Sequence, residues 1–200
     1  MDLYFSPLAC SMATRIALYD AGAEARFIEV DTRAKRVGDG SDFFAVNPMG
    51  QVPALRTDDG TLLTENPAVL QYVADRFPQS GLAPPPGPAR YRLQQWLNFV
   101  TSELHKVVFI PLLDPKAPEG AKAYARDKAP ARLGALDRHL TGREWLLDGF
   151  TVARPSISAS LYVTCAVGPD GALACWGDNT LGQLGNGTTV SSATPVTVPG

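Results

Sequence analysis

Several features that would assign this chain to a common class are absent from its 200 residues. The longest unbroken apolar run, residues 107–113, contains Pro111, whereas a membrane-spanning helix needs about 20 apolar residues. Basic residues do not outnumber acidic ones, and the net charge of −2 argues against a protein held to nucleic acid by phosphate contacts. The N-terminus lacks the basic and apolar segments of a secretory signal. We therefore expect a cytoplasmic protein that binds neither membranes nor nucleic acid.

Charged residues are nearly absent from the last quarter of the chain. All 18 lysines and arginines lie in residues 1–154. Residues 155–200 contain only Asp170 and Asp178 as charged groups and are rich in serine, threonine and glycine. A single domain seldom changes composition so sharply, so the chain is expected to join two pieces of different origin near Arg154.

The first piece begins with an alternation of strand-like and helical segments. Met12, Ile16 and Tyr19 are spaced four and three residues apart, as on one face of a helix. The Asp-Gly turn at residues 58–60 separates two strand-like runs and predicts a hairpin. The order strand–helix–strand, then strand–strand–helix, is typical of a thioredoxin-like domain, which we place at residues 1–81. The expected strands are residues 2–5, 26–31, 52–56 and 61–64, and the expected helices are residues 10–21 and 66–77.

A purely helical pattern follows a proline-rich linker at residues 83–88. A second helix, around Leu136, is expected to be broken upstream at Pro130, because an internal proline loses a hydrogen bond and clashes with the preceding turn. Residues 89–153 therefore form part of an all-α domain in this interpretation. One long helix should bury apolar residues spaced four and three apart, namely Leu93, Leu97, Val100, Leu104 and Val107.

Cys10 lies at the start of the first expected helix, directly after the first strand. Unpaired N–H groups and the helix dipole stabilise an anion there, so the pKa of this thiol should fall and its thiolate should be favoured. The alternative is that Cys10 is a small buried residue without a chemical role.

Two further segments of the same domain carry candidate binding groups. Gln51-Val52-Pro53 precedes a strand, and in a thioredoxin-like fold the proline at this place is cis and presents the preceding backbone to a peptide-like thiol. Glu65 and Asn66 begin the next helix, where backbone N–H groups can hold a carboxylate. The alternative for Asn66 is a simple helix cap.

The long helix also carries a polar stripe. Asn98, Ser102 and His105 are spaced four and three residues apart and should share one face, with Glu103 and Lys106 beside it. Such a stripe is usually a solvated face. The apolar neighbours of the histidine favour a water-lined pocket instead.

Four ordered blocks in residues 1–153 match the pattern of a known family. They are Leu-Tyr-Phe-Ser-Pro-Leu-Ala-Cys-Ser from Leu3, Phe-Phe-Ala-Val-Asn-Pro-Met-Gly-Gln-Val-Pro-Ala-Leu from Phe43, Leu-Thr-Glu-Asn-Pro-Ala-Val-Leu-Gln-Tyr-Val-Ala-Asp from Leu63 and Trp-Leu-Asn-Phe-Val-Thr-Ser-Glu-Leu-His-Lys from Trp96. This part of the chain resembles the beta-class bacterial glutathione S-transferases. The resemblance implies a thioredoxin-like domain followed by an all-α domain, in a homodimer that binds glutathione and a small electrophilic substrate.

The resemblance also implies roles for individual residues. Cys10 would lie beside the glutathione sulfur, where family members can form a mixed disulfide. Lys35 would hold the glycyl carboxylate, and the backbone of Val52 would pair with the cysteinyl unit. The γ-glutamyl end would lie at Glu65 and Asn66. The implied glutathione-binding residues are Lys35, Gln51, Val52, Pro53, Glu65, Asn66, Asn98, Ser102 and Glu103, some of them reaching across the dimer, and the implied catalytic residues are Cys10 and His105.

The family pattern stops at Arg154. The transferases have aspartate there, which completes a capping box begun by Thr151 and starts a buried helix, but arginine cannot accept the hydrogen bond. We therefore expect the all-α domain to be truncated. Residues 157–200, with Ala-Cys-Trp-Gly-Asp-Asn-Thr-Leu-Gly-Gln-Leu-Gly within them, resemble one RCC1-like propeller repeat. Because one repeat has no neighbour to stack on, residues 155–200 should be a short β-rich or disordered tail with one hairpin at most and no function of its own.

Two cysteines fall in this tail. Cys165 and Cys175 should stand nearly opposite each other on the hairpin around residues 168–171. In a cytosolic host we expect both to be reduced. Without a histidine or further cysteine nearby they make a poor zinc site, and no metal is expected.

Two functions remain open from the sequence. The first is an enzyme that conjugates glutathione to small electrophiles, as in detoxification, or carries out glutathione-dependent thiol–disulfide exchange at Cys10. The alternative is a non-catalytic glutathione-binding or interaction protein, inactive because its helical domain is truncated. A propeller-type interaction module has the support of a single repeat.

Overall fold

The computed structural model describes residues 1–7, 9–153, 157–159, 163–167, 173–177, 179, 184 and 186–198. The chain divides into two compact units, residues 1–80 with 156–200 and residues 81–155. Within the described residues, no helix is both long and apolar enough to cross a membrane.

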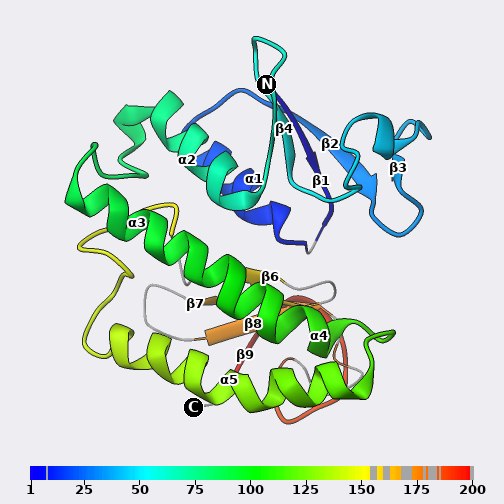
Figure 1. Ribbon diagram of the computed structural model, residues 1–200, viewed down its shortest axis with the longest axis vertical. Coiled ribbons are helices and arrows are strands. Elements are labelled where there is room, and N and C mark those ends of the chain that lie inside the picture. The colour runs from blue at the N-terminus through cyan, green and yellow to red at the C-terminus, as the bar shows by residue number, and fades with distance from the viewer. Residues whose placement is uncertain are drawn as a thin grey trace. The chain divides into compact units, whose positions relative to one another are not determined.

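The first 80 residues alternate strands and helices: β1 (Asp2–Phe5), α1 (Ser11–Asp20), β2 (Arg26–Asp31), β3 (Arg36–Val37), the 3-10 turn η1 (Phe43–Ala45), β4 (Ala54–Arg56), β5 (Leu62–Thr64), α2 (Asn66–Arg76) and the 3-10 turn η2 (Pro78–Ser80). The sheet has the order β3-β2-β1-β4-β5. Strand β1 is parallel to β2 and antiparallel to β4. Helices α1 and α2 pack against each other beside the sheet (Figure 1). The thioredoxin-like order expected from the sequence is confirmed.

Alternating side chains give each face of this sheet its own core. Tyr4 of β1 packs with Phe43 and Ala54 on one face. Leu3 precedes Tyr4 in β1 and Leu55 follows Ala54 in β4, so both point to the opposite face, where both are completely buried. Burying a large apolar side chain contributes about 1.5–3 kcal/mol, so both faces help to hold the sheet.

Residues 81–155 form a helical unit with α3 (Pro88–Phe99), η3 (Val100–Phe109), α4 (Ile110–Leu113) and α5 (Glu119–Leu140). Figure 1 shows α3 and α4 as parts of one continuous rod. Its middle segment, η3, is a π-helix, in which the Ile110 N–H donates to the carbonyl of His105. A π-helix turns more slowly than an α-helix, so the expected spacing of four and three residues does not hold along it. Leu104 and Val108 are buried there, whereas Val100 and Val107 are only half-buried.

Helix α5 differs from the sequence-based expectation at Pro130. It continues from Glu119 to Leu140 without ending at the proline. Pro130 is exposed, as is Arg126 four residues earlier. Water can therefore hydrate the Arg126 carbonyl that would otherwise accept the missing hydrogen bond. The helix buries little, because Ala125 is its one buried residue.

After the helices, the tail forms a separate antiparallel sheet. Its strands pair in the order β6-β7-β8-β9, and they are β6 (Ile157–Ala159), β7 (Val163–Val167), β8 (Leu173–Gly177) and β9 (Ser192–Thr197). The expected hairpin is present as β7 and β8, with Cys165 opposite Cys175 in register, although its connecting residues lie outside the described ones. The expectation of one hairpin at most is wrong, because β6 and β9 extend the ladder on both sides.

Two features stabilise the tail sheet. Asn179 is completely buried, and its side-chain amide donates to the carbonyls of Thr188 and Val190 at 2.9 and 3.2 Å while its oxygen accepts the Leu184 N–H at 2.8 Å. Cys175 is disulfide-bonded. The expectation that it is reduced is therefore wrong. Facing residues of an antiparallel pair lie close enough for such a bond, and the cytosolic setting on which the expectation rested is not a property of the fold.

Candidate functional site

Cys10 lies where β1 passes into α1, at the N-cap of the helix. Its side chain is half-buried, and its Sγ donates to the backbone oxygen of Val52 at 3.4 Å. The loop before it is fixed by Ser11, whose buried hydroxyl accepts the Ser6 N–H at 3.1 Å and donates to the Ser6 carbonyl at 3.3 Å. The thiol is therefore held at the positive end of a helix and beside a backbone carbonyl.

Asn66 connects the starts of α1 and α2. Its Nδ2 donates to the Cys10 carbonyl at 2.8 Å, and its Oδ1 accepts from the Thr14 hydroxyl at 2.9 Å. Thr14 is completely buried. Asn66 therefore holds the Cys10 backbone, and its amide still has one further donor and one further acceptor position for a ligand.

The segment before β4 is held in a fixed conformation. The Val52–Pro53 peptide bond is cis, as expected for this fold. The buried side chain of Asn47 donates to the Gln51 carbonyl at 2.7 Å and accepts the Met49 N–H at 3.1 Å. The Gln51 side chain is exposed. Asn47 thus fixes the backbone that brings the Val52 oxygen to Cys10.

Gly50 and Lys35 form a close contact in the same segment. The Lys35 ammonium donates to the Gly50 carbonyl at 2.7 Å. Gly50 has φ +59°, and a Cβ there would approach the Phe44 ring to 2.7 Å and the Lys35 side chain to 3.2 Å. Only glycine fits this position without a shift of the Phe44 ring. The ammonium group of the half-buried Lys35 therefore lies beside the backbone of Gly50, two residues before Val52.

Glu65 is the N-cap of α2 and has φ +64°. Its carbonyl accepts the N–H groups of Ala68 and Val69, both at 3.0 Å. Its side chain is exposed. The backbone N–H groups at the start of α2 can therefore bind a carboxylate of a ligand. The exposed carboxylate of Glu65 can instead pair with an ammonium group of the same ligand.

The four candidates on the long helix have different surroundings. The exposed Ser102 donates to the Asn98 carbonyl at 2.9 Å, and Asn98 is exposed as well. Glu103 forms an ion pair with Arg132 of α5 at 3.1 Å. His105 is half-buried. All four belong to residues 81–155, whereas Cys10 and the other candidates belong to residues 1–80.

His105 has a shifted pKa. Burial lowers its pKa below the ordinary value of 6.5, and the neighbouring Lys106 cation lowers it further. The neutral form of the ring is therefore favoured at pH 7, and this form can accept a proton.

Three residues that support this site were missed from the sequence: Ser11, Thr14 and Asn47. Asn47 had a usable signal, because an asparagine before Pro-x-Gly commonly accepts hydrogen bonds from the turn that follows. Thr14 had no comparable signal, because its partner Asn66 lies 52 residues away. Within the described part of the chain, no group of three histidine, cysteine, aspartate or glutamate side chains could hold a metal ion.

Comparisons with known proteins match this arrangement. The family model of the glutathione S-transferase N-terminal domain matches residues 2–75, and that of the regulator of chromosome condensation (RCC1) repeat matches residues 170–200. Glutathione S-transferase GstA of Escherichia coli O157:H7 is 43% identical over 155 residues, covering 76% of this chain and 77% of GstA. The chain therefore belongs to the glutathione S-transferase family.

Solved structures agree with this assignment. A sphingomonad glutathione S-transferase complexed with glutathione has a TM-score of 0.72 and 47% identity, over 76% of this chain and 77% of that chain. A bacterial beta-class glutathione S-transferase from Sphingomonas chungbukensis has a TM-score of 0.72 and 46% identity over the same shares. The resemblance to the beta class is confirmed, as is the resemblance of the tail to an RCC1 repeat.

Proposed function

We propose that this chain is a glutathione-dependent transferase in which Cys10 reacts at, or lies beside, the glutathione sulfur. The observation that carries the proposal is the 3.4 Å contact between the Cys10 Sγ and the Val52 oxygen. A cysteinyl ligand that pairs with the Val52 backbone brings its own sulfur close to Cys10. The hydrogen bond to Val52 favours the neutral thiol, so the N-terminus of α1 favours a thiolate once the ligand backbone takes the place of that bond.

The remaining groups suit the two ends of glutathione. Lys35 supplies a cation for the glycyl carboxylate. Glu65 and Asn66, at the start of α2, supply a carboxylate for the γ-glutamyl ammonium group and donors for its carboxylate. Gln51, Val52 and Pro53 supply backbone for the cysteinyl unit between them. A structure similar to this chain was solved with glutathione bound, which supports the assignment.

Two reactions fit this arrangement. In thiol–disulfide exchange, the Cys10 thiolate attacks one sulfur of a disulfide, and the other sulfur leaves as a thiolate with the electron pair. A glutathione thiolate then attacks the substrate sulfur in that mixed disulfide, which forms a glutathionyl disulfide and restores the Cys10 thiolate. In conjugation, the glutathione thiolate bonds to an electrophilic carbon and displaces an anionic leaving group. Positioning the thiolate is the main contribution of the protein in both.

The family resemblance adds four residues of the helical unit to the proposal. Asn98, Ser102 and Glu103 contribute polar groups, and the neutral ring of His105 can accept a proton. The proposal includes a homodimer, a cytoplasmic location, and domains at residues 1–81, 89–153 and 155–200. A specific observation favours the non-catalytic alternative, because strand β6 is the next described element after Ala153, where the transferase pattern has a buried helix.

Three measurements test the proposal and separate it from the alternative. Calorimetric titration with glutathione should show saturable binding that Lys35→Ala weakens by about tenfold and the exposed Lys116→Ala leaves unchanged. Turnover should be measured with an aryl halide and with a small alkyl disulfide, and mass spectrometry should detect the mixed disulfide between Cys10 and the alkylthio group of that substrate. Cys10→Ala should abolish the mixed disulfide and the exchange reaction. Saturable binding without turnover in either assay would establish the alternative, and no binding at millimolar glutathione would overturn both.

A further inference from the structure

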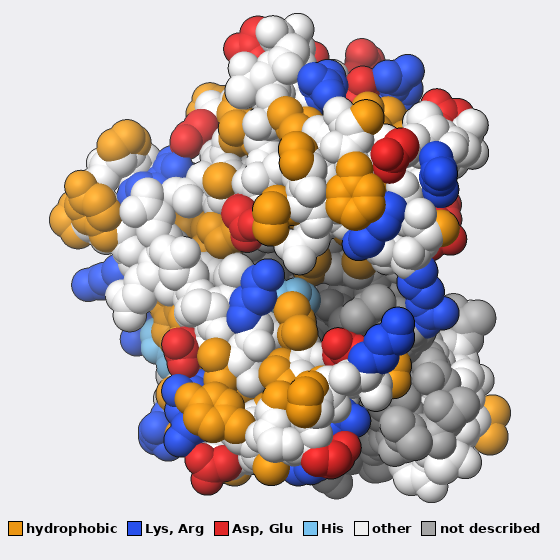
Figure 2. Space-filling model, turned by 45° about the vertical axis from the view of Figure 1, so that its right-hand side comes forward, with side chains coloured by type: hydrophobic (Ala, Val, Ile, Leu, Met, Phe, Trp, Pro, Cys, Tyr) orange, Lys and Arg blue, Asp and Glu red, His pale blue; other side chains and the backbone are white. Residues whose placement is uncertain are grey.

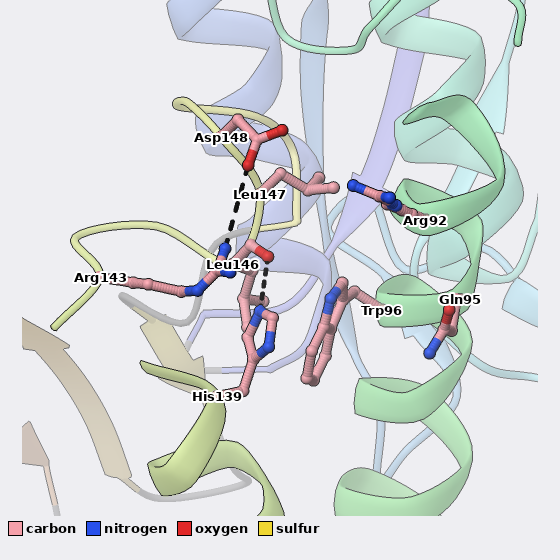
Figure 3. Close-up of a pocket in the computed structure, with 8 residues that line it drawn as sticks. All are labelled: Arg92, Gln95, Trp96, His139, Arg143, Leu146, Leu147 and Asp148. Carbon is pink, nitrogen blue, oxygen red and sulfur yellow. Dashed lines mark hydrogen bonds and ion pairs between the residues drawn. The ribbon is translucent and has the colours of Figure 1, made fainter. Parts of the chain in front are cut away.

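A cavity of about 360 Å³ lies within residues 81–155, between α3 and the segment that follows α5 (Figure 3). That volume is at the lower end of the range for small-molecule sites, about 300–1,000 Å³. None of the residues implied in glutathione binding contributes to its lining. The lining residues are Arg92, Gln95, Trp96, His139, Arg143, Leu146, Leu147 and Asp148.

One wall of this cavity is aromatic and held in place. The rings of Trp96 and His139 lie with centroids 4.3 Å apart at 41°. The Nε2 of His139 lies 2.8 Å from the Leu146 carbonyl, which can only accept, so Nε2 carries the hydrogen. Leu146 itself is 1% exposed. The wall therefore offers a fixed apolar and aromatic surface for a planar ring.

The polar groups at the cavity give it an excess positive charge. Arg92 projects from α3 toward the loop that holds Leu147, and Arg143 lies across from it (Figure 3). Arg143 is 3.9 Å from Asp148, but their side chains are 51% and 88% exposed, so this ion pair is weak. Among the described residues, Arg92 has no hydrogen-bond or ion-pair partner. Two guanidinium groups and one carboxylate thus leave one net positive charge beside an aromatic wall.

We propose that this cavity is a second binding site, separate from the glutathione site, for a small aromatic carboxylate. The planar ring packs against Trp96 and Leu147, which are both half-exposed. The carboxylate accepts hydrogen bonds from Arg92 and Arg143, a geometry in which guanidinium groups bind carboxylates more strongly than neutral donors do. An uncharged ring of the same shape would keep the apolar contacts and lose the charged ones.

The test uses 2-naphthoate as the probe and its uncharged amide, 2-naphthamide, for comparison. Binding to the full chain is followed by calorimetry and by tryptophan fluorescence. Naphthoate should bind with a Kd about tenfold or more below that of the amide. Arg92→Gln and Arg143→Gln should each weaken naphthoate binding by about tenfold and leave amide binding unchanged. The matched control is Arg126→Gln, an exposed arginine of α5 outside the lining, which should change neither.

Three further measurements locate the bound naphthoate and check the fold of each variant. Trp96→Phe should remove most of the fluorescence change, because Trp96 lines the cavity. Thermal melting checks that each variant folds, and saturating glutathione should leave naphthoate affinity unchanged. The proposal is overturned by equal binding of naphthoate and amide, by equal effects of the lining and control arginines, by displacement with glutathione, or by no binding at millimolar naphthoate. A failure of glutathione binding alone would overturn the proposed function and not this site.

Discussion

The cysteines of this chain are held in chemically different ways. Cys10 carries a thiol at the N-terminus of α1, 3.4 Å from the Val52 carbonyl, whereas Cys175 is 2% exposed and already in a disulfide. The same residue type therefore lies as a thiol at the start of a helix in one place and as a buried disulfide in a strand in the other.

This difference predicts selective labelling. Iodoacetamide at mildly acidic pH should alkylate Cys10 first, because only the thiolate reacts and the helix N-terminus favours it. Cys175 should be labelled only after a reductant and a denaturant have been added. Peptide mapping by mass spectrometry measures both. Labelling of Cys175 in the native, unreduced chain, or slower labelling of Cys10 than of a cysteine in an unfolded peptide, would contradict the argument.

The amide of Asn66 offers a second residue-scale test. Asn66→Ala removes the acceptor of the buried Thr14 hydroxyl and one donor to the Cys10 carbonyl, so it should destabilise residues 1–80 by about 1–3 kcal/mol. Thr14→Val should destabilise residues 1–80 by a similar amount. The double variant should lose less stability than the two single variants added together, because both single changes break the same hydrogen bond. Native-state hydrogen exchange of α1 measures all three. Strictly additive effects would show that the bond contributes nothing to stability.

The sequence points to the proposed ligand-contacting residues better than to the residues that hold them in place. Cys10 and Asn66 are found because each lies at the start of a helix, and Val52 is found because it precedes the proline before a strand. What Asn66 touches is not visible in the sequence, because the contact with Thr14 spans 52 residues and neither residue interrupts its helical pattern. The helix-cap alternative for Asn66 is wrong, because Glu65 is the N-cap of α2 and the Asn66 side chain bonds to Thr14 and Cys10 at the start of the other helix.

At the scale of elements, helix α5 contains a residue that ordinarily ends a helix. Pro130 lies inside it and is exposed, and Gly134 follows one turn later. Pro130→Ala should stabilise the helical unit by up to about 3 kcal/mol, since alanine restores the hydrogen bond and removes the clash. Gly134→Ala should add about 1 kcal/mol, because its Cβ would meet only the flexible end of Arg138 at 3.3 Å. Thermal unfolding followed by circular dichroism measures both changes. A lower Tm for Pro130→Ala would mean that other contacts depend on the proline.

His105, in the π-helix η3, should make the free energy of unfolding of the helical unit depend on pH. Its pKa is lower in the folded chain than its ordinary value of 6.5, so below that pH the unfolded chain binds a proton that the folded chain does not. The free energy of unfolding of the helical unit should therefore fall as the pH decreases through 6.5 toward the folded-state pKa.

Two variants test this dependence. His105→Gln should flatten the dependence, and Lys106→Gln should reduce it, because the lysine cation contributes to the shift. Denaturant unfolding at several pH values measures the free energy. An unchanged slope in His105→Gln would assign the dependence to another group.

Elements follow the sequence closely where one periodicity holds from end to end. The strand expected at residues 26–31 is β2, and the helix expected at residues 66–77 is α2, which ends one residue earlier. The π-helix η3 is not predictable in this way, because its residues fit an α-helical spacing equally well and the difference lies in backbone hydrogen bonds. Two-residue β3 is too short to show any period.

At the scale of the whole molecule, charges of both signs are interspersed over the face shown in Figure 2. This distribution fits the net charge of −2 and the absence of a basic excess in the sequence. The compositional change near Arg154 corresponds to a change of architecture, because helices precede it and an antiparallel sheet follows it. The sequence alone could not show that the tail completes a four-stranded sheet, because β9 pairs with β8 across a segment with no strand pattern.

Burial is unevenly distributed between the sheet of residues 1–80 and the helical unit. Two of the four residues of β1 are buried, whereas one of the 22 residues of α5 is. Each buried large apolar side chain contributes about 1.5–3 kcal/mol, so the helical unit should be the less stable of the two. Hydrogen exchange should therefore be faster in Glu119–Leu140 than in β1 and β2, and limited proteolysis should cut the helical unit first and spare residues 1–80. Pro130→Ala is the matched variant, because it should slow exchange in α5 and leave β1 unchanged. Equal protection of α5 and β1 in the unmodified chain would show that the two units unfold together.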